Sequence, residues 1–541
     1  MKINLFKRNL TQSKLNYRDL IIPILLFVVG MYVLPLRIVG LNFEFIPGDL
    51  GDARFNNIVL EHGYLFIINK VDWFWNAHYM YPSKLVIARS DNLLGTLPIY
   101  AASRFIGFDR YTAFQLWFIV LHALNYIFCF WVVNKLFKNS IIAAIGAYVF
   151  AFGIFNIGQI YHAQIFPRFM LPLIFYWTIK FLKEQESKHF SFLLFAVVYQ
   201  FYCGIYLGFF GLYSILFLVI GYFLVYRDFS LFKKMPIRKD SIIYISSIAV
   251  SLASLYTLFK PYFIISKETG MRPFESVIDS IPHLTSYIFS TPASFIWGDY
   301  LFQPFVDSTN LWWTHLLFPG VFPILFFLLS IILLIQSIIK NKSAKELSFL
   351  ILSSFLSLLF CINIEGFTLY ELIYEIPGFS SMRALNRIIN SQIIFFILTL
   401  SFVLNYIYKH TKWGKAVLLA IVPLIVLDNY YILSNDVVRY RKSDSIEDVE
   451  GIKSTIQQSD TINFKAVAYN FKDKSSHSTI ITKHISVIIA CQDLGIQCIN
   501  GYSGSYPDNY MSFFDLTNEI ALNNWLDQTN TLRSDVLLIN E

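Results

Sequence analysis

The sequence predicts an α-helical polytopic membrane protein with about 11 transmembrane helices and a small soluble α/β domain at its C-terminal end. Three observations support this fold class. Of the 541 residues, 56% are hydrophobic and only 15% are charged, whereas ordinary soluble domains are about 45–50% apolar and about 25% charged. The mean hydropathy is +0.53, and apolar runs of spanning length recur along the chain. This composition excludes a soluble enzyme and a nucleic-acid-binding protein.

Crossing a bilayer takes about 20 predominantly apolar residues. Segments of this kind lie at 20–39, 112–134, 140–156, 166–182, 190–206, 207–226, 241–264, 313–338, 346–363, 388–408 and 415–433. A further apolar stretch, at 92–106, is short and contains Arg104, so we expect a helix that lies on the membrane surface. The first segment lacks a signal-peptide cleavage motif and is expected to remain as an anchor.

The charges between these segments predict the topology. Lys and Arg gather at the N-terminus and then in every second connection, at 135–138, 180–188, 227–239, 340–345 and 409–415. Because cytoplasmic loops carry the excess of Lys and Arg, residues 1–19 are expected inside and the C-terminus outside. The transmembrane domain then covers 20–433, with outer loops at 40–111, 265–312 and 363–387. The inner connections are short and basic, so the candidate chemistry lies on the outer face.

The tail, residues 434–541, differs from the rest in composition and contains no spanning run. Strand-like runs at 462–470, 496–500 and 535–539 alternate with helix-like stretches at 479–494 and 512–529, which predicts a small α/β domain outside the membrane. Cys491 and Cys498 both lie in it. In an oxidising outer compartment they would form a disulfide, and two reduced buried thiols are the equally open alternative.

The first outer loop opens with an acidic motif between Pro47 and Asn57. Asp49, Asp52 and Asn56 follow spacings of three and four, so in a helix they would share one face just above the first span. A single aspartate here is explained as a helix cap, but two carboxylates close to Glu61 and His62 are typical of sites that supply a general base. Asp49 and Asp52 are therefore the candidate catalytic residues, with the choice between them open. The candidate substrate-binding residues of this loop are Arg54, Asn56, Glu61, His62 and Asp91.

A second group of candidates lies in the short outer turn between residues 158 and 168. His162, Gln164 and Arg168 place two hydrogen-bonding side chains and a cation in this turn, which suits a phosphate or a sugar hydroxyl. In the alternative interpretation, Arg168 extends to lipid headgroups and His162 satisfies backbone groups.

A third group, Arg383 and Arg387, precedes the tenth span on the predicted outer side, against the charge rule. At a spacing of four, the two arginines would share a helix face, and paired guanidinium groups suit bidentate phosphate binding. A structural pairing with Glu371 or Glu375 is the alternative.

The order of these features resembles a known class. A first span leading into an acidic outer loop, a surface helix before the second span, ten or more spans and an outer C-terminal domain resemble the GT-C-fold glycosyltransferases. The matching runs are Pro47–Asn57, Ser90–Gly107, His162–Arg168, Pro377–Arg387 and Asn500–Gly504, and they are similar to those of a poorly characterised group of bacterial membrane proteins associated with that fold.

The resemblance implies transfer of a sugar from a polyprenyl-phosphate donor to a glycan, lipid or protein acceptor in cell-envelope polysaccharide biosynthesis. The reaction would invert the anomeric centre on the outer face of a bacterial inner membrane, with Asp49 or Asp52 as base. Arg383, Arg387 or Arg168 would stabilise the leaving phosphate. The only cofactor to consider is a divalent cation held by Asp49 and Asp52. A lipid-linked glycan polymerase or ligase, a transporter and a scaffold without catalysis are the alternatives.

Overall fold

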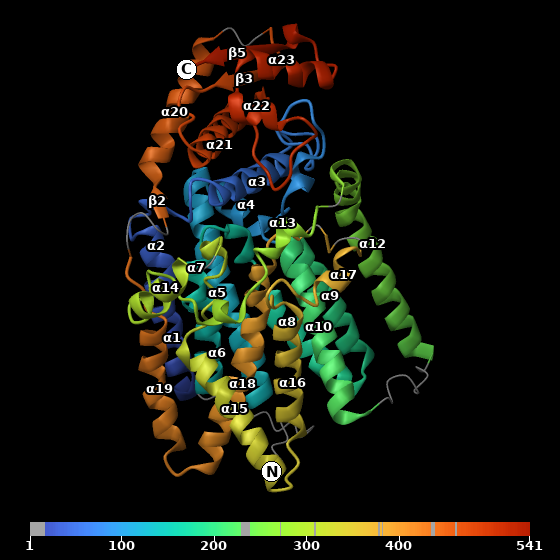
Figure 1. Cartoon of the computed structure of the whole chain (residues 1–541), viewed down its shortest axis with the longest axis vertical. Coiled ribbons are helices and arrows are strands. Elements are labelled where there is room, and N and C mark those ends of the chain that lie inside the picture. Colours follow the sequence, from blue (N-terminus) through green and yellow to red (C-terminus); the bar gives the residue numbers. More distant parts are fainter. Residues whose placement is uncertain are drawn as a thin grey trace.

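The computed structural model describes residues 17–228, 238–270, 272–307, 310–376, 379–380, 382–433, 439–459 and 463–541. Most of the predicted cytoplasmic N-terminus (1–19), two lysines of one inner connection (Lys233 and Lys234) and Pro377 lie outside the described residues. A bundle of long helices carries a smaller C-terminal unit at one end (Figure 1).

All the predicted spans are helices in the structure. They are α1 (Ile21–Met31), α5 (Arg110–Phe137), α6 (Ser140–Phe152), α8 (Met170–Glu184), α9 (Ser187–Cys203), α10 (Ile205–Tyr226), α12 (Arg238–Thr269), α15 (Val321–Ile339), α16 (Lys345–Phe360), α18 (Ile389–His410) and α19 (Gly414–Asp428). α1 continues through a π-helical turn (Tyr32–Leu36) into α2 (Arg37–Val39).

Eight helical segments of the described chain are long and apolar enough to cross a membrane. α9, α16 and α19 contain 17, 16 and 15 residues, at or below the lower end of the range of about 17–25 residues for a span. The fold is therefore that of a polytopic membrane protein, while the total of 11 spans stays a prediction. α15 begins at Val321 and not near residue 313, because Gly320 has a φ of +98° and Pro319 lacks an amide hydrogen.

Two helices form the centre of the bundle. In Leu385–His410, the segment that contains α18, all residues of the most apolar stretch of 18 are buried. In Ser140–Gly158, the segment that contains α6, 94% of them are buried. α18 packs against α6, α15 and α16, so it needs apolar residues around its whole circumference. At the other extreme, only 6% of the most apolar 18-residue stretch of α12 is buried. This helix stands at the margin of the bundle (Figure 1).

The basic connections gather at one end of the bundle. The Nζ atoms of Lys183 and Lys345 lie 5.1 and 6.0 Å from the ring centroid of Tyr226, which is the last residue of α10. Three of the predicted inner connections therefore share one end of the bundle, as the charge alternation requires. The side of the membrane on which this end lies stays a prediction.

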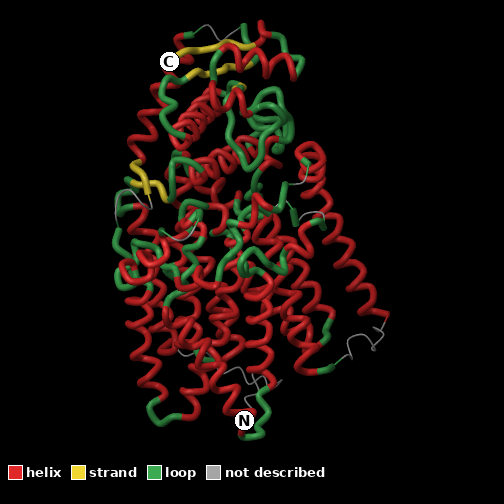
Figure 2. Tube along the Cα trace, in the orientation of Figure 1, coloured by secondary structure: helices red, strands yellow, loops and turns green. Residues whose placement is uncertain are grey.

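The C-terminal unit contains a three-stranded parallel sheet of order β4-β3-β5. Its elements are α20 (Lys442–Gln458), β3 (Ala466–Asn470), α21 (His477–Leu494), β4 (Gln497–Cys498), α22 (Met511–Leu516), α23 (Glu519–Gln528) and β5 (Val536–Asn540). Each predicted strand run overlaps a strand, and the stretch 479–494 lies within α21. The stretch 512–529 is divided into two helices, because Thr517 has a φ of +49°, and α20 was not predicted. Cys491 and Cys498 are buried free thiols. Figure 2 shows that the strands are confined to this unit and to one small antiparallel pair.

That pair joins the first outer loop to the C-terminal unit. β1 (Phe45–Pro47) pairs with β2 (Arg439–Arg441), so the chain directly after the first span is fixed to the chain directly before α20. α3 (Asp52–Ile67) follows β1 and packs against α21, α4 and α5. The shorter helices α4 (Leu97–Phe105), α7 (Phe155–Gly158), α13 (Glu275–Ile278), α14 (Gly298–Val306) and α17 (Glu371–Tyr374) cap this end of the bundle. α4 confirms that 92–106 contains a short helix and no span.

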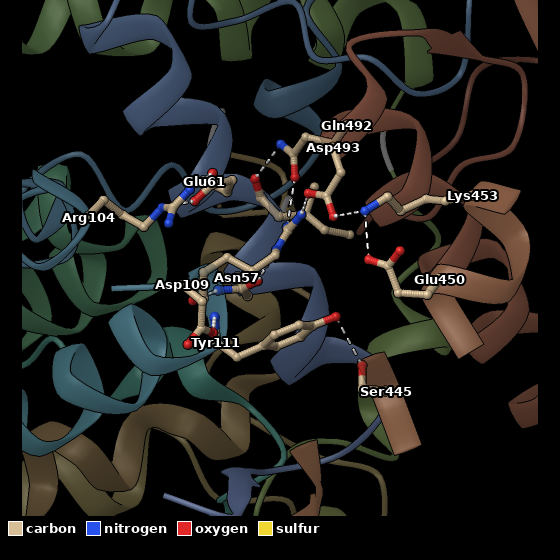
Figure 3. Close-up of polar contacts among 12 residues, drawn as sticks. Asn57, Glu61, Arg104, Asp109, Tyr111, Ser445, Glu450, Lys453, Gln492 and Asp493 are labelled. Atoms are coloured by element: carbon tan, nitrogen blue, oxygen red, sulfur yellow. Dashed lines mark hydrogen bonds and ion pairs between the residues drawn. The ribbon is translucent and has the colours of Figure 1, made fainter. Parts of the chain in front are cut away.

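A polar network attaches the C-terminal unit to the bundle, and Figure 3 shows Gln492 and Asp493 of that unit facing Asn57 of α3. Arg110, the first residue of α5, donates to Asp493 and Gln492, each at 2.8 Å, and to Asn57 at 3.0 Å. The Gln492 side chain in turn donates to the carbonyl oxygen of Ile58 at 3.1 Å. The arginine is 5% exposed, and a buried charge with all its partners in place fixes two elements in one arrangement.

Candidate active site

A cavity of about 710 Å³ lies between the helix bundle and the C-terminal unit. α3, the first outer loop, the C-terminal end of α12 and the segment before α18 form its walls, and residues 502–508 cover it. Six of the residues predicted from the sequence line this central cavity: Asp52, Asn56, Asp91, Gln164, Arg383 and Arg387. The fold thus brings together candidates from four separate parts of the chain.

Asp52 is held by hydrogen bonds at both carboxylate oxygens. Tyr502 of the C-terminal unit donates its hydroxyl to Oδ1 at 2.6 Å, and the Nδ1 atom of His162 lies 2.9 Å from Oδ2. The Arg387 guanidinium is 4.0 Å from the same Oδ2 atom. Three segments that are far apart in sequence therefore orient one side chain at the cavity wall.

These contacts set the charge of Asp52. Burial by itself would favour the protonated acid, but the hydrogen bonds from His162 and Tyr502 and the charge of Arg387 outweigh it and hold the pKa of Asp52 well below its usual range. Burial and the charge of Arg387 lower the pKa of His162. The pair is therefore a carboxylate that accepts a hydrogen bond from a neutral imidazole, and Asp52 stays ionised at neutral pH.

Asp49 has a different role. Its Oδ1 atom accepts a hydrogen bond from the amide of Ala53 at 2.9 Å, so it caps the N-terminus of α3, and it does not belong to the lining of the central cavity. Burial and the nearby charge of Asp52 raise the pKa of Asp49 to about 7. The spacing predicted that Asp49, Asp52 and Asn56 share one helix face. This prediction was wrong for Asp49, because α3 begins only at Asp52.

The two arginines of the third group both line the cavity, but in different ways. The segment before α18 is irregular up to Ala384, so Arg383 and Arg387 do not share a helix face, and this expectation was wrong. Arg387 is 8% exposed at its side chain and pairs with Asp52 and not with Glu371 or Glu375. Arg383 is exposed, and its backbone amide donates to the hydroxyl of Tyr206 at 3.0 Å. In the part of the chain that the structure describes, its guanidinium has no ion-pair partner.

Asp91, Asn56 and Gln164 are the other predicted residues that line the central cavity. Asp91 accepts a hydrogen bond from the amide of Ile205 at 2.7 Å, at the start of α10, and burial raises its pKa to about 6. Asn56 donates to the side-chain oxygen of Gln164 at 2.9 Å. These groups present polar atoms to the cavity and also hold α3, α10 and the outer turn together.

Three predicted binding residues have structural contacts away from the cavity. Arg54 donates to Ser486 at 2.9 Å and so joins α3 to α21. Glu61 forms a two-point contact with Arg104, with both distances 2.9 Å, and Figure 3 shows this pair beside the Arg110 network. His62 is fully buried, and its Nε2 atom lies 3.0 Å from the carbonyl oxygen of Phe74.

Arg168 also lies outside the cavity lining and is fully buried. It donates to the carbonyl oxygen of Phe150 at 2.7 Å and to the side-chain oxygens of Asn156 and Asn390. This arginine therefore joins the start of α8 to α6 and α18 and does not extend to lipid headgroups.

Replacing Arg168 with Gln is expected to lower the free energy of unfolding by about 3–5 kcal/mol, because it leaves buried oxygens of its partners unpaired. Thermal unfolding of the purified protein in detergent measures the change, and the exposed Arg441→Gln serves as control. A variant that unfolds like the wild type but has lost activity would instead assign Arg168 to substrate binding.

Several cavity residues were not among the predicted candidates. They are Arg89, Tyr206, Tyr262, Arg272, His477, Tyr502, Tyr506 and Asp508. Tyr502 belongs to one of the runs that carry the resemblance, and Arg89 directly precedes another, which begins at Ser90. The residues of α12 were hidden because this helix continues to Thr269, five residues beyond the predicted span, and so reaches the cavity.

The described residues around Asp52 do not fit a divalent cation. Both Asp52 oxygens already accept hydrogen bonds, the Arg387 guanidinium supplies positive charge at 4.0 Å, and Asp49 caps a helix. Among the described residues, the one group of three ligand atoms within 4.8 Å of one another is Glu184, Glu186 and His189, where α8 ends and α9 begins. Metal sites need several converging ligand atoms, and the Asp52 site offers one carboxylate and one imidazole.

No protein-family model matches the chain, and no curated protein matches it. Among solved structures, the oligosaccharyltransferase of Archaeoglobus fulgidus in the apo form aligns with a TM-score of 0.48 and 11% identity, over 95% of this chain and 69% of that chain. The archaeal oligosaccharyltransferase AglB of Archaeoglobus fulgidus, in complex with an inhibitory peptide and a dolichol-phosphate, aligns with a TM-score of 0.44 and 9% identity over the same shares.

Proposed function

We propose that this protein transfers a sugar from a polyprenyl-phosphate donor to a glycan, lipid or protein acceptor of the cell envelope, with inversion at the anomeric carbon. One observation carries the proposal. The ionised carboxylate of Asp52 and the guanidinium of Arg383 face one cavity at the end of a membrane-type bundle. A lipid-linked donor must approach from the bilayer, and a cavity at the ends of the helices meets that requirement. We place this cavity on the outer face of a bacterial inner membrane, following the charge alternation.

In this mechanism Asp52 is the general base. It accepts the proton of the acceptor hydroxyl while that oxygen bonds to the anomeric carbon, on the face opposite the phosphate. The bond from the anomeric carbon to the phosphate oxygen breaks, and its electron pair goes to the phosphate. Tyr502 and His162 each occupy one site on the carboxylate. An ionised carboxylate has about four acceptor sites, so two remain for the hydroxyl.

The arginines divide the remaining work. Arg387 lies 4.0 Å from Asp52, which is too close to reach a leaving group on the opposite face of the sugar, so its role is to keep Asp52 ionised. Arg383 lines the same cavity with its guanidinium unpaired among the described residues and is assigned to the leaving phosphate. No step is assigned to a metal ion, because the donor set at Asp52 does not fit one.

A lipid-linked glycan polymerase or ligase is the second candidate. It is favoured by the four arginines that line the cavity: Arg89, Arg272, Arg383 and Arg387. Such an enzyme would take a diphosphate-linked donor and transfer a whole glycan. It would depend on the arginines more than on Asp52.

The test is turnover of a donor panel by the purified protein. Polyprenyl-phosphate sugars and diphosphate-linked glycans are supplied separately, and release of the lipid phosphate is measured with and without a chelator. We expect one monophosphate sugar to turn over and the activity to persist after chelation. Turnover of the diphosphate donors alone would favour the polymerase or ligase, and the absence of any turnover would contradict both. Loss of activity with the chelator would contradict the metal-free assignment.

A further inference from the structure

A second group of polar and cationic side chains lines the central cavity, on other elements than those that carry Arg383 and Arg387. It forms where three segments meet: the short 3₁₀ turn Val86–Arg89 of the first outer loop, the chain that follows α12, and residues 502–504 of the C-terminal unit. We call it the Arg89 site, and three side chains make it up: Arg89, Arg272 and Ser503.

Arg89 supplies a buried guanidinium with unused donors. Its side chain is only 1% exposed, and its Nη2 atom pairs with Glu268 near the end of α12. Its Nε and Nη1 atoms are buried and have no hydrogen-bond partner among the described residues. A buried charged group with unpaired donors is costly. The oxygens of an anion are the acceptors that match a guanidinium best.

Arg272 and Ser503 add further donors at the same place. The Arg272 guanidinium donates to the carbonyl oxygen of Gly504 at 2.6 Å, and a Cβ atom on Gly504 would lie only 2.8 Å from the carbonyl oxygen of Arg89. Gly504 therefore contacts both arginines. The adjacent Ser503 side chain is buried, and its hydroxyl has no hydrogen-bond partner in the described part of the chain.

The position of Tyr502 relates the Arg89 site to the acceptor and not to the leaving group. Tyr502 donates to the carboxylate of Asp52 at 2.6 Å, and Ser503 follows it directly in the chain. In an inverting displacement the base contacts the acceptor, and the leaving group lies on the opposite face of the sugar. A ligand that contacts both Asp52 and Ser503 is therefore the acceptor.

We propose that Arg89, Arg272 and Ser503 bind an anionic group of the acceptor, a carboxylate or a phosphate close to the hydroxyl that receives the sugar. The proposal rests on the function proposed above, because it places that hydroxyl at Asp52. A neutral acceptor would leave the buried donors of Arg89 unpaired, so the site discriminates against it.

Binding of matched acceptor probes to the purified protein, measured by calorimetry without any sugar donor, tests the site. The probes are p-nitrophenyl glucoside, its phosphate monoester and the corresponding glucuronide, which share one ring and differ in the group at its exocyclic carbon. We expect the better of the two charged probes to bind about tenfold more tightly than the neutral one. Comparing the two charged probes distinguishes a phosphate from a carboxylate. Equal binding of all three would overturn the proposal.

Substitutions connect this preference to the named residues. Arg89→Gln and Arg272→Gln should each remove most of the preference for the charged probe, whereas Arg533→Gln, away from the cavity, should keep it. Thermal unfolding checks that each variant is folded. If the buried Arg89 cannot be replaced, Ser503→Asp serves instead, because a like charge at this position should abolish the preference. Folded variants with the wild-type preference would contradict the assignment.

Competition with a short lipid phosphate separates the Arg89 site from the arginine assigned to the leaving group. At saturating citronellyl phosphate, the charged probe should still bind, because the two anions would contact different arginines. Displacement of the probe would assign Arg89 to the donor phosphate and overturn the proposal. A charge preference without turnover of any sugar donor would support the anion site and contradict the transferase. Equal transfer to charged and neutral acceptors would contradict the anion site alone.

Discussion

Replacing Asp52 with Asn is expected to lower the rate of sugar transfer about 10³-fold, because a positioned general base contributes about 10²–10⁴ to such a rate. Asn keeps the size of the side chain and can still accept the Tyr502 hydroxyl, so the cavity should keep its shape. The measurement is release of polyprenyl phosphate from the turned-over donor, with kcat and KM determined separately. The loss should fall on kcat, since Asp52 acts on the proton that moves in the transition state.

Asp49→Asn is the matched control. Asp49 accepts the amide of Ala53 at the start of α3, and Asn can accept the same hydrogen bond, so this variant should unfold like the wild type and keep most of its turnover. Two outcomes would contradict the assignment. Asp52→Asn with wild-type turnover would remove Asp52 from the mechanism, and loss of turnover in a stable Asp49→Asn variant would make Asp49 the base.

The second large effect is expected at Arg383. Arg383→Gln should lower kcat/KM about 10²–10³-fold, because removing one donor from a developing negative charge has a cost of that order. Arg383→Lys keeps the charge but loses the two-point geometry, so it should recover part of the rate. Initial rates at several donor concentrations separate the effect on binding from the effect on the chemical step.

The control for Arg383 is Arg533→Gln. Arg533 is an arginine of the C-terminal unit that lies 3.4 Å from Glu519 and does not line the cavity. Its replacement should leave turnover unchanged. If Arg383→Gln keeps wild-type kinetics while Arg387→Gln loses activity, the phosphate is held by Arg387 and the division of roles between the two arginines is wrong.

Hydrophobic periodicity and charge alternation are sufficient to predict which segments form the helices of the bundle. Each apolar run of spanning length is a helix, because a chain in lipid satisfies its backbone groups only within helices or closed barrels. The strands near 466, 497 and 536 followed from apolar runs between turn residues. The apolar run by itself places the start of α15 about eight residues too early, because Pro319 and Gly320 keep the chain out of the helix up to Val321.

The site was only partly accessible from the sequence. The acidic loop, the outer turn and the arginines before α18 are predictable, because their polar and charged residues lie between apolar segments. Sequence spacing could not distinguish Asp49 from Asp52, since both precede or begin the same helix. It also could not separate a functional arginine from a structural one, and Arg168 satisfies buried oxygens of α6 and α18.

The sequence by itself determined that this is a membrane protein, which segments form its helices, and that its polar residues cluster at one end. Those properties depend on each segment's own preference for lipid or water. Only the tertiary structure decided that Tyr502 donates to Asp52 across 450 positions and that α12 extends into the cavity. It also decided that Arg387 pairs with Asp52, while the Arg383 guanidinium has no ion-pair partner among the described residues. Such contacts depend on how separate helices pack, and no local pattern in the chain records which distant side chains will meet.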